Sequence, residues 1–188
     1  GTTRFTAIFY VSESTRIGSI RSARLIDTTL TEMFGGALIA SGMSDGTLER
    51  LRNKSWYDAV ISNSTGFSCP PICRESESAN SVFVSTNDVW TQLDNLGLNI
   101  QPTMQGLAFQ NNTPSNGSVG TTIRIDYSRE AHSEWRYNDD NKSYDRWAEI
   151  SKEELAPHLD YKTNSQITAD NILILFANHV VDSTVPED

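Results

Sequence analysis

Apolar and polar side chains form short periodic patterns along the first part of the chain. Aromatic and β-branched residues alternate with polar ones over residues 3–11, which predicts a strand. Apolar residues recur at helical spacing over 25–34 and two glycines follow, so we predict a helix there with Ser22 as its N-cap. Similar patterns predict strands over 37–41, 57–62 and 81–85, and helices that begin near Ser44 and at Thr86 or Asn87.

The pattern changes after a stretch rich in Asn, Ser and Gly at residues 111–120, which we interpret as a linker. Residues 121–127 have the alternation of a strand. Two aromatic segments, 135–137 and 144–147, flank a polar turn at 139–141, which predicts a β-hairpin.

Two further elements are expected near the end of the chain. Residues 151–155 have the pattern of one helical turn, and the apolar run 172–176 predicts a strand buried on both faces. We therefore predict a mixed α/β (α+β) chain: in residues 1–112 helices cover a sheet, and residues 118–188 form a β-rich, incomplete portion.

Charge and length narrow the function classes. The chain has 188 residues and a net charge of -9, with charges nearly balanced up to residue 60 and the acidic excess after it. An acidic chain without a basic stripe is a poor ligand for nucleic acid, and no apolar stretch is long enough to span a membrane. An anion would therefore bind at a local pocket, and the first sixty residues are the place to look.

The two cysteines, Cys69 and Cys73, lie in a Pro-rich loop with three residues between them. We predict a small disulfide, which would place the domain outside the cytoplasm. Free thiols, a redox pair and half of a metal site are the alternatives. The spacing is unusual for a redox pair and no histidine lies nearby in sequence, so no metal and no cofactor are expected.

The segment around Arg21, Ser22 and Arg24 is the strongest candidate for a binding site. Two guanidinium groups, a hydroxyl and the backbone N–H groups of a helix start make a cradle for phosphate, sulfate or carboxylate. Arg4 could add a third guanidinium from the neighbouring predicted strand. The alternative is structural: Arg24 pairs with Asp27 one turn later, and Arg21 pairs with another carboxylate.

The chain resembles the YerB-like bacterial lipoproteins, the DUF3048 family, in residues 1–9, 17–24, 135–137, 144–146 and 160–174. The chain has Ser19 and Leu25 where the family usually has proline, and the two cysteines are not a family feature. The resemblance implies an extracytoplasmic α/β protein of unestablished function, which continues beyond this chain and is held at the membrane by a lipid anchor outside it. It supplies no catalytic residue, although Asp160 and Asn171 fall on motif positions.

Three hypotheses remain open at this point. In the first, the chain is an extracytoplasmic binding module whose arginines take an anionic envelope polymer or meet a protein partner. In the second, it is an enzyme acting on such a polymer, with Asp160 or a histidine as general base. In the third, the arginines only tie the two portions together through ion pairs, and there is no ligand.

Overall fold

The chain is an α+β protein, as the sequence predicts. The structure is a computed structural model that describes residues 5–103, 116–128, 131–152, 154–174, 176, 178 and 185. These residues separate into two compact units. The N-terminal unit takes in residues 6–103 and Val185, and the C-terminal unit takes in Phe5 and the described residues of 116–178. Each unit thus includes a residue from the far end of the chain.

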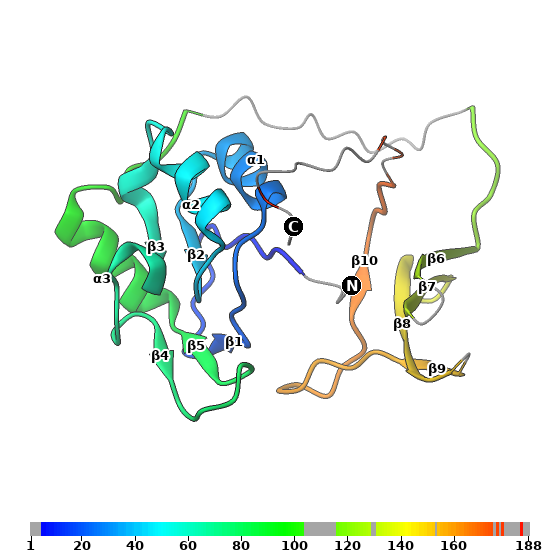
Figure 1. Ribbon diagram of the computed structural model, residues 1–188. Helices are drawn as coiled ribbons and strands as arrows, with labels where there is room; N and C mark the ends of the chain where they lie inside the picture. The colour runs from blue at the N-terminus through cyan, green and yellow to red at the C-terminus, as the bar shows by residue number, and fades with distance from the viewer. Residues whose placement is uncertain are drawn as a thin grey trace. The chain divides into compact units, whose positions relative to one another are not determined.

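The N-terminal unit combines helices with two small sheets (Figure 1). Strands β2 and β3 pair in parallel, and β5 pairs antiparallel with β1 on one side and β4 on the other. The elements are β1 (Ile17–Gly18), α1 (Leu25–Phe34), β2 (Leu38–Ala40), α2 (Asp45–Arg52), the 3-10 helix η1 (Tyr57–Ala59), β3 (Val60–Ser62), the 3-10 helix η2 (Asn63–Thr65), β4 (Cys73–Arg74), β5 (Val82–Val84) and α3 (Thr86–Leu96).

The β2–β3 pair separates two apolar clusters, because successive side chains of a strand point to opposite faces. Leu38, Ala40 and Val60 join Leu51 of α2 in one cluster. Ile61 belongs to the other cluster, with residues of β5, α3 and the preceding loop: Ile72, Val82, Val84, Val89 and Leu93. Figure 1 shows α3 on one side of the β2–β3 pair and α1 and α2 on the other.

Local capping explains where the helices begin and end. The Ser44 hydroxyl accepts the N–H of residue 47 at the start of α2, as predicted. At the start of α3 the N-cap is Ser85, so the prediction of Thr86 or Asn87 placed it one or two residues too late. Gly35 and Gly97 end α1 and α3 in the left-handed conformation, with φ of 58° and 69°, which favours glycine.

Two predicted strands are wrong. The described part of the first, residues 5–11, has no regular secondary structure, and Val11 is 82% exposed. In the second, residues 172–174 and 176 are not in a strand, and Phe176 is 96% exposed. Both patterns record a local preference, whereas a strand also needs a hydrogen-bonded partner, which a pattern does not supply.

The C-terminal unit is built from strands in its described residues, in the order β10–β8–β7–β6 with β9 also paired to β8. The predicted helical turn over 151–155 is wrong, because this segment folds back and enters β9. The strands are β6 (Thr122–Ser128), β7 (Ala131–Asn138), β8 (Ser143–Ser151), β9 (Glu154–Pro157) and β10 (Thr168–Ala169).

The predicted hairpin is confirmed between β7 and β8. Its turn is held by two side-chain amides: Asn138 accepts the N–H of Asp140 over 3.0 Å, and Asn141 accepts that of Ser143 over 3.1 Å. In the part of the chain that the structure describes, no helix is long and apolar enough to cross a membrane.

Gly18 provides a test of the packing between β1 and β5. A Cβ atom added to Gly18 would overlap the Phe83 ring and lie 2.7 Å from the Val82 carbonyl oxygen, whereas one added to Gly36 meets nothing within 4 Å. We expect Gly18→Ala to lower the free energy of unfolding by about 1–3 kcal/mol, because the backbone oxygen cannot move aside. Gly36→Ala is the matched control and should change it by less than about 0.5 kcal/mol.

The measurement is urea unfolding followed by tryptophan fluorescence. Equal midpoints for the two alanine variants would contradict the close approach of β1 to β5.

Candidate anion-binding site

Residues 21–23 run extended beside residues 41–43, and this pairing decides where α1 begins. Two backbone hydrogen bonds of 2.9 and 3.1 Å and a parallel bridge join the two segments. A helix capped by Ser22 would need helical backbone from the next residue, which the extended pairing excludes. The N-cap is therefore Arg24, and the prediction of Ser22 as the N-cap is wrong.

The start of α1 already holds a carboxylate. Asp27 accepts the backbone N–H of Arg24 over 2.8 Å and the hydroxyl of Thr6 over 2.8 Å. A carboxylate in the first turn is favourable because it faces the positive end of the helix dipole. An external anion at the helix start, as expected from the sequence, would have to compete with Asp27.

Arg21 points to another place, the β4–β5 turn, which we define as residues 75–81. Its Nη1 donates a hydrogen bond to the side-chain oxygen of Asn80, and the Ser19 hydroxyl donates to the backbone oxygen of the same residue. Arg21 itself is exposed. Among the described residues it therefore contacts a neutral amide, and both of these bonds lie within the N-terminal unit.

A second arginine reaches the same turn from β4. Arg74 is exposed, and its Nη1 donates to the carbonyl oxygen of Ser78 over 2.9 Å. A guanidinium has five N–H donors, so one hydrogen bond to a neutral oxygen leaves both its charge and most of its donors for a ligand. Arg21 and Arg74 share this condition. Arg74 contacts Ser78 and Arg21 contacts Asn80, at the two ends of the segment 78–80.

A third arginine at the turn is neutralised. Arg16 donates to both carboxylate oxygens of Glu75, at 2.8 and 3.3 Å, and its guanidinium carbon lies 3.5 Å from the centroid of the Phe83 ring. The hydrogen bond from Arg16 lowers the pKa of Glu75, so this carboxylate stays ionised. In this bidentate pair the charge of Arg16 is balanced by a carboxylate of the protein itself.

The β4–β5 turn is fixed by its own serines. The buried Ser81 hydroxyl lies 2.6 Å from the carbonyl oxygen of Ser76 and 2.7 Å from that of Ser78. The backbone N–H of Asn80 donates to the Ser78 hydroxyl over 3.2 Å. These bonds hold the acceptors of Arg21 and Arg74 in place. Besides Glu75, which pairs with Arg16, a second acidic side chain, Glu77, lies in the same turn and reduces its net positive charge.

Cys69 and Cys73 form a disulfide in the structure, with their Cα atoms 4.5 Å apart. Cys73 is the first residue of β4 and directly precedes Arg74. Ile72, inside the ring, is buried in the core. The disulfide ring therefore fixes the backbone directly before Arg74, where the chain passes from the buried core to the surface.

The other predicted residues lie elsewhere. Arg4 is outside the described residues. Asp160 and Asn171 are exposed residues of the C-terminal unit. Asp160 accepts hydrogen bonds from the backbone of Lys162 and from the backbone and hydroxyl of Thr163, and those from Thr163 lower its pKa. These hydrogen bonds stay within residues 160–163, so Asp160 holds the turn that it begins.

Sequence reasoning missed Arg74 and Asn80. Arg74 and Asn80 come close to Arg21 only because β4 pairs with β5, and Arg21 lies far from both in sequence. The available signal was an arginine next to a cysteine, followed by a serine-rich turn. Within the described ranges, no group of three or more His, Cys, Asp or Glu residues is placed to hold a metal ion.

Arg146, from one of the segments that resemble the family, is a buried residue at the centre of the C-terminal unit. It is 8% exposed, and its guanidinium carbon lies 4.4 Å from the centroid of the Phe5 ring. Its Nη1 lies 2.8 Å from Nδ1 of His158, and its carbonyl oxygen accepts from the backbone of His158 and the side chain of Gln166. Arg146 thus joins β8 to the segment between β9 and β10.

Comparison with known proteins assigns this two-unit α+β fold to a family. The family model described as "Protein of unknown function (DUF3048) N-terminal domain" matches residues 1–99, and that of the C-terminal domain matches residues 123–188. The chain belongs to the DUF3048 family.

Among solved structures, the chain is similar to the YerB protein from Bacillus subtilis, with a TM-score of 0.67 and 21% sequence identity. The match covers 86% of this chain and 53% of that one, so the chain spans about half the length of that protein. A likeness at this identity shows the fold. No curated protein matches the chain.

His158 provides a pH test of the Arg146 network. Burial, and then the charge of Arg146, lower the pKa of His158 below the ordinary histidine value of about 6.5. The unfolded chain therefore binds a proton more readily than the folded one, so this histidine lowers stability as the pH falls below about 6.5. We expect the C-terminal unit of wild type to lose stability between about pH 7 and pH 5.

The control is His158→Gln, whose amide can accept from Arg146 without titrating, and it should show a smaller loss over the same interval. Urea unfolding followed through the indole NMR signals of Trp135 and Trp147 measures the difference. Identical pH dependence in the two proteins would rule out this role of His158.

Proposed function

We propose that this chain is a non-catalytic binding module that takes an anionic group at Arg21 and Arg74, on the β4–β5 turn. One observation carries the proposal: both guanidinium groups are exposed, and the described residues offer them only neutral oxygen acceptors. Their remaining donors suit the oxygens of a phosphate or a carboxylate. The proposed site keeps Arg21 of the predicted cluster and takes Arg74 in place of Ser22 and Arg24.

The setting favours a repeated, polymeric anion over a single small one. Arg21 and Arg74 are exposed, so a contact with one isolated anion is weak in water. A polymer presents many anionic groups to the site, so that a group which dissociates is quickly replaced by its neighbour. We therefore favour an anionic envelope polymer as the ligand, and a protein partner with an acidic segment is the alternative.

We propose that this module lies outside the cytoplasm. Support comes from the disulfide between Cys69 and Cys73, since such bonds persist in oxidising compartments. The family resemblance adds the proposal that the longer protein is a lipoprotein, anchored through a lipid that lies outside this chain.

The test is a binding titration with inorganic polyphosphate, and in parallel with poly-glutamate, at low ionic strength. We expect Arg21→Gln and Arg74→Gln each to weaken polyphosphate binding about three- to tenfold, the loss of one charge-assisted contact. If poly-glutamate binds more tightly than polyphosphate, carboxylate is the preferred group.

The matched control is Arg52→Gln, which removes the same charge from an exposed position on α2. It should change the affinity less than twofold, about the size of a screened surface charge effect. Equal losses in all three variants would reduce the binding to general charge attraction and overturn the site. Far-UV circular dichroism checks that each variant is folded.

A further inference from the structure

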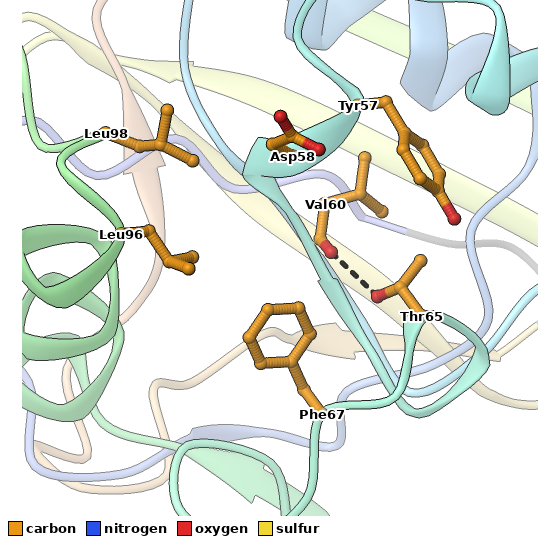
Figure 2. Close-up of a pocket in the computed structure, with 7 residues that line it drawn as sticks. All are labelled: Tyr57, Asp58, Val60, Thr65, Phe67, Leu96 and Leu98. Atoms are coloured by element: carbon orange, nitrogen blue, oxygen red, sulfur yellow. Dashed lines mark hydrogen bonds between the residues drawn. The ribbon is translucent and has the colours of Figure 1, made fainter.

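A pocket of about 320 Å³ lies at the C-terminal end of α3, apart from the residues of the anion site. Its lining is mostly apolar, with one carboxylate. The lining residues are Tyr57, Asp58, Val60, Thr65, Phe67, Leu96 and Leu98 (Figure 2). All of them belong to the N-terminal unit.

The end of α3 explains why two leucines meet at this pocket. Gly97 turns the chain with φ of 69°, and the N–H of Leu98 bonds back to the carbonyl of Leu93 over 2.8 Å. Leu96 and Leu98 thus leave the helix end toward the pocket, and Leu96 is 43% exposed. Phe67 approaches from the segment after η2 (Figure 2).

The hydroxyl of Thr65 belongs to the wall and is already used. It donates to the carbonyl oxygen of Val60 over 2.7 Å, and the Phe67 N–H bonds to the carbonyl of Ser62 over 3.0 Å. These bonds satisfy backbone acceptors of β3 beside the pocket. These polar groups of the wall are therefore already hydrogen-bonded within the protein, and the wall offers a ligand apolar surface.

Asp58 is the exception in this lining. It lies in η1, is exposed, and has no hydrogen bond or ion pair with any residue that the structure describes. In Figure 2 its carboxylate lies at the opposite side of the pocket from Phe67. An ionised carboxylate beside apolar walls favours a ligand that joins an apolar body to a positive charge.

We propose that this pocket binds a small organic ammonium ion whose hydrocarbon part packs against Phe67, Leu96 and Leu98 and whose charge faces Asp58. The volume is at the lower end of the range for small-molecule sites, which suits a single ring or a branched chain. The net charge of -9 also favours a cation over an anion at this position. The site is independent of the proposed anion site and has the opposite charge preference.

The test compares phenethylammonium with 2-phenylethanol, a neutral molecule of nearly the same shape, on the full chain. Titrations followed through the methyl NMR signals of Val60, Leu96 and Leu98 report binding at the pocket itself. We expect the ammonium ion to bind about fivefold more tightly than the alcohol, the size of one partly screened ion pair. Equal affinities, or no shift of these methyl signals with either compound, would overturn the proposal.

Two variants and a control separate the charge from the apolar walls. Asp58→Asn should remove the preference for the ammonium ion and leave binding of the alcohol unchanged, and Leu96→Gln should weaken both. Asp170→Asn removes an exposed charge in the C-terminal unit and should leave the preference as in wild type. If Asp170→Asn lowers the preference as much as Asp58→Asn, the attraction comes from the general charge of the chain and the pocket has no cation site.

Discussion

The parallel pairing of β2 with β3 is the constraint on which the N-terminal unit depends. Only three residues of each strand take part, yet they separate two apolar clusters. Val60 and Ile61, neighbours in sequence, are 1% and 0% exposed because each fills a different cluster. A shift of register by one residue would send both side chains to the wrong face, so the pairing fixes the helices that cover each side.

The same arrangement distributes the arginines. Beyond β2 the chain continues into residues 41–43, which hold residues 21–23 extended and delay the start of α1. Asp27 then supplies the negative charge at the helix start, and Glu75 neutralises Arg16. Arg21 is left facing an amide. Arg16, Arg21 and Arg24 are close in sequence, yet they lie in three separate environments. Of these, we propose that of Arg21 for an anion.

The parts of this fold that could be predicted from sequence are those fixed within a few residues. Gly35 ends α1 and Ser44 begins α2 through contacts along the chain, and the polar turn between two aromatic segments marks the β7–β8 hairpin. The position of Ser22 depended on a segment twenty residues away, and the apolar run 172–176 found no partner strand in its described residues. Arg74 was missed for the same reason: it meets the turn that Arg21 contacts only after β4 and β5 have paired, which no local pattern records.

The division of the chain bears on how the protein unfolds. Phe5 is counted with the C-terminal unit and Val185, 2% exposed, with the N-terminal one. Neither unit is therefore a continuous piece of sequence, and a cut in the linker would separate each from a residue that it contains. Unfolding of either unit therefore exposes a residue from the far end of the chain as well as the unit's own continuous stretch. A truncation at either terminus would reach a unit formed mainly by the other half of the sequence.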